Sequence, residues 1–219
     1  MRGPGAMVAR LRPVTRPGFA FFDTAIGRCG IAWTGRGVSG VQLPEKADPE
    51  TRARLRQRFP AALEATPPAA VRRVLDRIVA HLRGEKVNLS RAALDMERVP
   101  PFHRRVYEMA RSIAPGTTLS YGDVAERIGS PGSARAVGQA LGRNPFAIVV
   151  PCHRVLAAGG KIGGFSADGG VTTKIRLLSL EGVRVNSDSA PFLGRMGGWH
   201  LSPVPAISQR SVPRKKSRP

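Results

Sequence analysis

The sequence predicts an α+β protein with a small N-terminal α/β domain and a helical second domain that carries a reactive cysteine. β-like runs separated by glycines come first, and amphipathic helical patterns follow them. A helix, a glycine-containing turn and a second helix then precede the pair Cys152–His153, the order of a helix-turn-helix unit followed by a candidate nucleophile. With 219 residues, 42% of them apolar, the chain can bury a core in each part.

The N-terminal half contains three strand patterns and two helical patterns. The strands are expected over Phe19–Asp23, Cys29–Thr34 and Val38–Leu43, as a hairpin or meander. A charged helix is expected over Pro49–Phe59 with Asp48 as its cap, and an amphipathic helix over Ala69–Leu82 that Gly84 ends.

Neither Cys29 nor His81 lies in a catalytic pattern. Cys29 has no second cysteine or histidine near it at metal-ligand spacing, so it is interpreted as a packing residue. His81 falls on the last turn of the second helix and is interpreted as a surface or helix-end residue rather than a ligand.

The second half is predicted to contain a helix-turn-helix. A helix over Pro101–Ile113 leads to a short helix over Tyr121–Ile128 and to a second helix that Ser133 caps and that runs to about Arg143. The second helix is unusual because most of its side chains are small. Those small residues are Ala134, Ala136, Gly138, Ala140 and Gly142.

Such a helix can approach a sugar-phosphate backbone closely but can read few base edges, which favours DNA binding without strong sequence preference. Arg135 is one of its three long polar side chains. The alternative is that the small residues only allow close packing inside the domain.

The apolar run Phe146–Val150 is predicted to be a short buried strand that Pro151 stops, which places Cys152 just past the strand end. A thiol with an ordinary pKa of about 8.5 is mostly protonated at neutral pH, so a nucleophilic cysteine needs a base such as His153. From the dipeptide alone, a buried and inert cysteine beside a surface histidine is the other interpretation.

The charge of +20 indicates a polyanionic partner, with nucleic acid the leading candidate. Residues 1–17 carry +4, residues 184–219 carry +6 and the body still carries +10.

We expect four segments: a disordered basic extension (1–17), an N-terminal α+β domain (18–99), a catalytic domain (100–184) and a disordered basic tail (185–219). The start could be an extended upstream start or a transit peptide, and the tail could attract phosphates or act as a nuclear targeting cluster.

Two cysteines far apart and no apolar run of membrane length favour a reducing, cytoplasmic setting.

The motifs of the second half resemble those of the 6-O-alkylguanine-DNA alkyltransferases, also called methylated-DNA-protein-cysteine methyltransferases. The resemblance covers residues 101–183. It rests on Ser120-Tyr121-Gly122, on Ala134-Arg135-Ala136-Val137-Gly138, on Asn144-Pro145, on Val150-Pro151-Cys152-His153-Arg154-Val155, on Gly163-Gly164-Phe165-Ser166, on Lys174 and on the closing Leu177 to Gly182.

The resemblance implies a role for each matching position. Cys152 is the alkyl acceptor, His153 the base that acts through a water, and Glu181 the carboxylate that orients the histidine. Around them, Tyr121 donates to the leaving guanine, Ser166 lies near the alkylated oxygen, the backbone of Val155 reads the exocyclic amine, and Asn144 ties the recognition helix to the cysteine loop.

On the DNA, Arg135 fills the gap left by the flipped nucleotide, and Ala134, Ala136 and Gly138 allow minor-groove approach.

The implied activity is DNA repair by direct reversal. One alkyl group moves from 6-O-methylguanine, or less efficiently 4-O-methylthymine, to the protein itself, which is then spent. The resemblance implies a ribonuclease-H-like N-terminal domain, double-stranded DNA as partner, no cofactor, and a cytoplasmic monomer that joins the bacterial nucleoid when bound to DNA. We expect no metal, since Cys29 lacks partners.

Phe165 stands where many relatives have tyrosine, and Ala167-Asp168 look like an insertion, so the lid over the alkyl group is expected to differ in shape. The competing functions are a lesion-binding protein that does not react, a helix-turn-helix regulator and a cysteine hydrolase. The first is disfavoured by Cys152, the second leaves the Cys-His pair unexplained, and the third leaves the DNA-binding helix unexplained.

Overall fold

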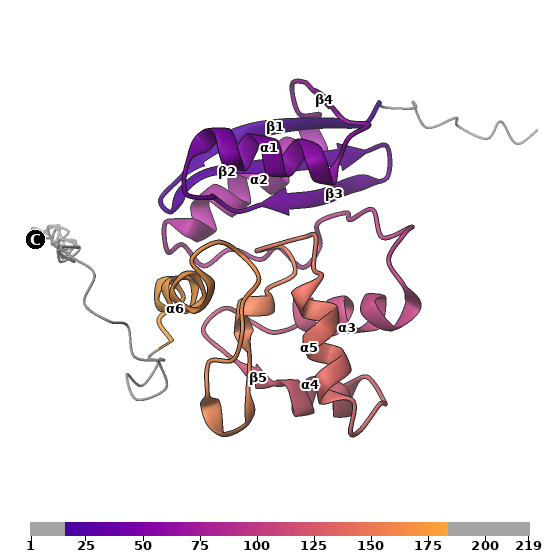
Figure 1. Ribbon diagram of the computed structural model, residues 1–219, viewed down its shortest axis with the longest axis vertical. Coiled ribbons are helices and arrows are strands. Elements are labelled where there is room, and N and C mark those ends of the chain that lie inside the picture. The colour runs from indigo at the N-terminus through magenta and orange to yellow at the C-terminus, as the bar shows by residue number, and fades with distance from the viewer. Residues whose placement is uncertain (1–15, 184–219) are drawn as a thin grey trace, which may run out of the picture.

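The computed structural model describes residues 16–183. Its N-terminal half is built around a four-stranded sheet (Figure 1). The expected extension (1–17) and tail (185–219) lie outside these residues, apart from Arg16 and Pro17. The strand order is β3-β2-β1-β4, with β1, β2 and β3 antiparallel and β4 parallel to β1. The strands are β1 Gly18–Thr24, β2 Gly27–Thr34, β3 Gly37–Gln42 and β4 Leu63–Glu64.

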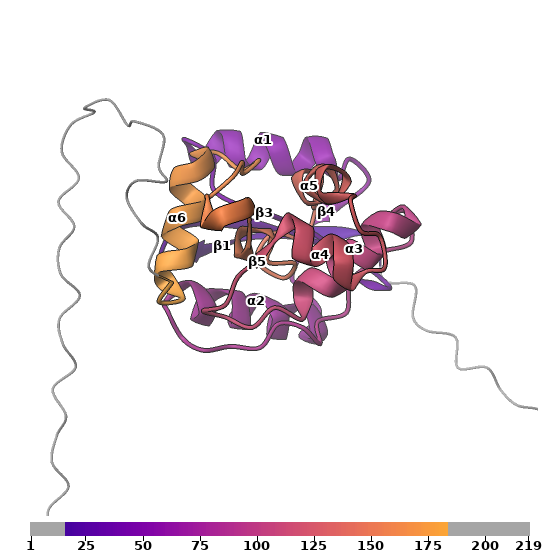
Figure 2. The same cartoon turned by 90° about the horizontal axis from the view of Figure 1, so that it is seen from below.

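Successive side chains of β2 point to opposite faces of the sheet, and both faces are apolar. Ile31 and Trp33 belong to the main core, whereas Ala32 packs with Phe19 and Leu55 in a smaller cluster. Helix α1 (Asp48–Arg58) supplies Leu55, and helix α2 (Ala69–Leu82) packs on the other face. Figure 2 shows the two helices on opposite sides of the sheet. Cys29 is fully buried in the main core, as a packing residue should be.

The start of α1 differs from the prediction. Asp48 does not cap the helix, because the N-cap residue is Ala47 and no side chain accepts a hydrogen bond from the first turn. Asp48 instead lies within that turn, where its negative charge faces the positive end of the helix dipole. The bounds of α2 are those predicted from its spacing of apolar residues.

The second half contains four helices and a small two-stranded ladder, within the described residues. The helices are α3 Pro101–Arg111, α4 Tyr121–Arg127, α5 Ala134–Gly142 and α6 Gly170–Leu180, and the strands are β5 Leu119–Ser120 and β6 Val155–Leu156. Both helices and strands are therefore present, and the α+β class is confirmed.

Helix α4 has a side-chain cap at its start, whereas α5 has none. Ser120 and Asp123 form a reciprocal capping box at the start of α4, which fixes the position of Tyr121. Ser133 is the N-cap residue of α5, as predicted, but its hydroxyl donates to the carbonyl of Ser130 and does not cap the helix amides.

The predicted strand over Phe146–Val150 is wrong. Phe146 forms a single parallel bridge with Val41, and the chain then turns, with the amide of Val150 donating to the carbonyl of Phe146 at 2.8 Å. Ile148 has a φ of +70°, a left-handed conformation that no strand contains and that a β-branched residue rarely adopts. Cys152 therefore follows a compact buried turn and begins a 3₁₀ turn, η1 (Cys152–Arg154).

The edge strand β3 joins the two halves at this turn. The amide of Val41 donates to the carbonyl of Pro145 at 2.8 Å, and Arg58 of α1 donates to the same carbonyl at 3.3 Å. The sheet thus supports the segment that leads to Cys152. Among residues 16–183, no helix combines the length and apolar character needed to cross a bilayer.

Candidate active site

Asn144 shapes the turn before the candidate nucleophile. Its Oδ1 accepts from the amide of Phe146 at 2.9 Å, and its Nδ2 donates to the carbonyl of Val150 at 2.9 Å. The two bonds clamp both ends of the turn that contains the strained Ile148, which the surrounding structure must hold in place. Asn144 therefore lies where the resemblance places it, between helix α5 and the cysteine.

Cys152 lies between two cavities. The larger, of about 760 Å³, is lined among others by Tyr121, Arg135, Gly138, Cys152, Phe165 and Ser166. The smaller, of about 200 Å³, shares Gly142, Cys152, Phe165 and Ser166 with it. Burial raises the pKa of the Cys152 thiol above its ordinary value, whereas the nearby charge of Lys174 lowers it. The thiol is therefore protonated at rest and needs a base to react.

His153 and Glu181 form that base system. The His153 side chain is fully buried, and its Nε2 lies 2.8 Å from Oε1 of Glu181. A carboxylate only accepts, so Nε2 carries the proton and Nδ1 is the basic nitrogen. Nδ1 is buried and has no hydrogen-bond partner among the described residues. Burial lowers the pKa of His153, although Glu181 raises it, and the imidazole is neutral and able to accept a proton at neutral pH.

Glu181 is a buried carboxylate with several donors. Burial alone raises its pKa, but hydrogen bonds from His153, His81 and Arg154 together hold that pKa well below its usual range. Arg154 donates from Nε at 2.9 Å and from Nη2 at 2.8 Å, and the amide of Gly116 adds a bond at 3.2 Å. Glu181 is thus ionised and fixed in place, which suits it to orient an imidazole.

His81 is a member of this network that the sequence interpretation missed. It is 3% exposed, so the surface alternative was wrong, although His81 does lie on the last turn of α2 as the helix-end alternative had it. Its Nε2 donates to Oε1 of Glu181 at 3.0 Å. Helix α2 of the N-terminal half thereby reaches the active site. Spacing along α2 predicts that His81 falls on a buried turn beside Ile78 and Leu82, and that burial was the only available signal.

By geometry alone, His81, His153 and Glu181 could hold a cation, since their ligand atoms lie within 4.8 Å of one another. Arg154 already places its positive charge on both oxygens of the same carboxylate. We therefore interpret the cluster as a hydrogen-bond network.

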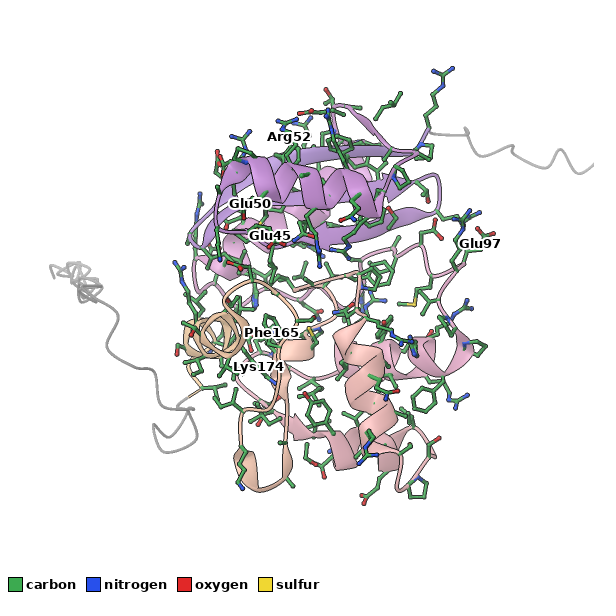
Figure 3. All side chains as sticks on the ribbon, in the orientation of Figure 1. Glu45, Glu50, Arg52, Glu97, Phe165 and Lys174 are labelled. Carbon is green, nitrogen blue, oxygen red and sulfur yellow. The ribbon has the colours of Figure 1, made fainter. Side chains whose placement is uncertain are left out.

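Lys174 is a second buried group whose position the sequence did not explain. Its Nζ donates to the carbonyls of Val155 at 2.7 Å and Ile162 at 2.6 Å, and it lies 5.8 Å from the ring centre of Tyr121. Burial lowers its pKa to about 8, whereas the Cys152 charge raises it. Lys174, labelled in Figure 3, thus ties β6 to the 162–164 loop. Its positive charge also lowers the pKa of Cys152.

The ring of Tyr121 packs against the loop that contains Gly163. A Cβ at Gly163 would lie 3.3 Å from the Tyr121 ring, and the φ of +68° at this position also favours glycine. Burial and the nearby Cys152 raise the pKa of Tyr121, so its phenol stays protonated and can donate a hydrogen bond into the cavity.

Val155 is buried and is not among the residues that line the larger cavity, and its carbonyl accepts from Lys174 while retaining a second lone pair.

Helix α5 presents Arg135 outward. Arg135 is exposed and lines the larger cavity together with Ala134 and Gly138, while Val137 and Ala140 face the core. Ala136 is half-buried and does not line the cavity. The structure therefore brings Arg135, Tyr121, Ser166 and Cys152 to one cavity, with His153 and Glu181 behind it.

Comparisons with known proteins identify the family of this chain. Residues 101–183 match the family described as 6-O-methylguanine DNA methyltransferase, DNA binding domain. The chain is 42% identical over 171 residues to a methylated-DNA–protein-cysteine methyltransferase of Mycobacterium tuberculosis, covering 78% of this chain and 95% of the relative. It is 38% identical over 154 residues to a protein of the same name from Methanothermobacter thermautotrophicus, covering 70% and 79%.

Solved structures show the same likeness. The chain is similar to Mycobacterium tuberculosis OGT in complex with DNA, with a TM-score of 0.60 at 35% identity, covering 75% of this chain and 92% of that one. It is also similar to the 6-O-methylguanine-DNA methyltransferase of Pyrococcus kodakaraensis, with a TM-score of 0.60 at 27% identity, covering 75% and 99%.

Proposed function

This chain belongs to the methylated-DNA–protein-cysteine methyltransferases, and we propose that Cys152 is the cysteine to which it transfers the alkyl group of damaged DNA. The chain is a DNA-repair enzyme of the alkyl-transfer type. The observation that carries the assignment of Cys152 is its position in the wall of the cavity that helix α5 also lines, next to the buried His153–Glu181 pair. Cys29 is buried in the sheet core, where burial raises its pKa to about 12, and it lines neither of these two cavities.

The proposed chemistry uses these groups in sequence. His153 Nδ1 takes the thiol proton through a water, and Glu181 stabilises the imidazolium that forms. The thiolate attacks the alkyl carbon, a C–S bond forms, and the C–O bond breaks with its electron pair left on the guanine. The guanine then takes up one proton, which balances the proton that the thiol lost. Tyr121 donates a hydrogen bond to the departing base, and Ser166 lies beside the alkylated oxygen. The thioether is stable, so each molecule reacts once and needs no cofactor.

Double-stranded DNA is the proposed partner, and the target nucleotide must leave the stack to reach Cys152. We assign Arg135 to the gap that remains, because it is exposed at the edge of the cavity. The small residues Ala134, Ala136 and Gly138 allow α5 to approach the minor groove. Asn144 holds the backbone of the turn before the cysteine through its hydrogen bond to Val150. Val155 contributes its backbone, which Lys174 holds in place, to the pocket for the base.

Further parts of the proposal follow from the family. They are a ribonuclease-H-like N-terminal domain over 18–99, a catalytic domain over 100–184, a cytoplasmic monomer, and weaker activity on 4-O-methylthymine. The antiparallel β1–β3 with a parallel β4 supports the first of these.

Intact-mass measurement tests the proposal. With a duplex containing 6-O-methylguanine, the protein should gain one methyl group, saturate at one equivalent and lose this reaction in Cys152→Ser, while Cys29→Ser keeps it. Tight binding of the duplex without a mass change would favour a non-reacting lesion-binding protein instead.

Arg135→Ala tests the flipping role separately. It should slow repair of duplex DNA far more than reaction with free benzylguanine, and equal losses on both substrates would refute that role.

A further inference from the structure

The smaller cavity beside Cys152 extends the reactive site toward the N-terminal half. Its wall includes Ala147 and Phe165 near the cysteine, and Glu45, Arg54 and Arg58 on the other side of the seam between the two halves. Figure 3 labels Glu45 on the upper half and Phe165 on the lower half. Its volume of about 200 Å³ is several times the ~30 Å³ share of one water molecule, so it has room for more than a methyl group.

The charged side chains of this cavity are mostly positive. Arg54, Arg58 and Arg143 line it, against the single carboxylate of Glu45. Glu45 accepts a hydrogen bond from Gln42 Nε2 at 2.8 Å, so part of its accepting capacity is already used. Burial lowers the pKa of Arg58 and the neighbouring charge of Arg54 lowers it further, whereas the charge of Glu45 raises it.

The three arginines differ in how firmly they are held. Arg58 donates to Gln42 Oε1 at 2.7 Å and to the Pro145 carbonyl, which fixes it between β3 and the turn before Cys152. Arg54 and Arg143 are exposed, and no hydrogen bond or ion pair of either side chain occurs among residues 16–183. Their donors are free for an anionic group that enters the cavity from the cysteine side.

We propose that this cavity receives the alkyl group and selects adducts that carry a negative charge, such as the carboxymethyl group of 6-O-carboxymethylguanine. The proposal rests on the proposed function, since the adduct must reach Cys152. The thiolate forms a C–S bond to the adduct's CH₂ carbon, and the C–O6 bond breaks with its electrons on the guanine. The thiol proton passes to His153, and the carboxylate keeps its charge and faces the arginines.

The test compares two adducts of the same shape. Single-turnover rates are measured by Cys152 peptide mass for duplexes with 6-O-carboxymethylguanine and with its neutral isostere, 6-O-carbamoylmethylguanine. Each exposed charge pair contributes about 1.4- to fivefold, so with two such pairs wild type should prefer the carboxymethyl adduct by at least about twofold. The double variant Arg54→Gln/Arg143→Gln should bring this ratio close to one, and high salt should also reduce it.

Arg56→Gln is the matched control, because Arg56 lies on the same helix, contacts the Phe19 ring and does not line the cavity. It should leave the ratio unchanged. If the arginines bind DNA phosphates instead, the double variant slows both adducts equally and the ratio stays at its wild-type value, which overturns the proposal. The same preference should persist with the free bases, which carry no phosphate.

Methyl transfer from 6-O-methylguanine separates the two proposals. If wild type transfers methyl but reacts with the carboxymethyl and carbamoylmethyl adducts at equal rates, only the charge selection is refuted. If no group is transferred to Cys152, the proposed function is refuted as well.

Discussion

Replacement of His153 by glutamine should remove the base while keeping a donor to Glu181. The amide of glutamine can still donate to the carboxylate but cannot take the thiol proton. Without a base, the rate follows the fraction of Cys152 present as thiolate. At pH 7 an ordinary thiol of pKa about 8.5 is about 3% ionised, and burial raises the pKa of Cys152 further. The variant should therefore react at least about 30-fold more slowly at pH 7.

The dependence of the rate on pH should also differ between the variant and wild type. A thiol below its pKa gains about tenfold in thiolate per pH unit, so the rate of His153→Gln should rise steeply from pH 7 toward alkaline pH. In wild type, burial lowers the pKa of His153, which keeps the imidazole neutral and basic at pH 7, and the profile should be flatter. Single-turnover methyl transfer from a 6-O-methylguanine duplex, measured between pH 6 and 9, supplies both profiles.

A matched control separates loss of the base from loss of the fold. His103→Gln changes a histidine on α3 that contacts the Phe102 and Tyr107 rings and takes no part in the Glu181 network. It should keep the wild-type profile. If His153→Gln also kept the wild-type rate at pH 7 and the same profile, the base role of His153 would be refuted.

Three further predictions concern the groups around Cys152. Asn144→Ala removes two hydrogen bonds from the turn that holds Ile148, so it should cost about 1–3 kcal/mol in urea unfolding and slow methyl transfer. Glu181→Gln leaves the buried Arg154 without its counter-charge and should cost about 3–5 kcal/mol. The pKa of Glu181 is depressed in the fold, so wild-type stability should be highest above about pH 4.5 and fall below it, with a weaker fall in the variant. His81→Phe should lower stability by about 1.5–3 kcal/mol, and His81→Gln, which keeps a donor, should restore part of it.

Each of these predictions has an outcome that opposes it. Unchanged unfolding of Asn144→Ala would mean that backbone packing alone holds the turn. An identical acid transition for wild type and Glu181→Gln would mean that this carboxylate does not contribute to acid stability. Equal stabilities for His81→Phe and His81→Gln would show that His81 acts by packing rather than by donation to Glu181.

The elements of this fold that follow local periodicity were predictable. The apolar spacing of α2 gave its bounds, and the small residues of α5 identified a helix of unusual character. The run 146–150 misled because a short apolar segment looks the same whether it is a strand or a buried turn. The side-chain hydrogen bonds of Asn144 and the positive φ of Ile148 decide between them, and neither is visible in hydrophobicity.

The catalytic network was predictable only in part. Glu181 lies 28 residues from His153, so their contact came from resemblance rather than from spacing. His81 lies 100 residues from Glu181 on a helix of the other half, and only the packing of α2 brings them together. Lys174 was expected to be a family position, but its burial against two carbonyls depends on the path of the 162–164 loop.

The fate of an isotopically labelled methyl group tests the central claim most directly. A duplex containing 6-O-([¹³C]methyl)guanine is reacted with the protein, and the label is followed in the digested peptides, in the DNA and in the solution. The label should appear once, as S-methylcysteine at Cys152, and the DNA should contain unmodified guanine. Label released as methanol would indicate hydrolysis, and label on Cys29 would place the acceptor elsewhere, and either result would contradict transfer to Cys152.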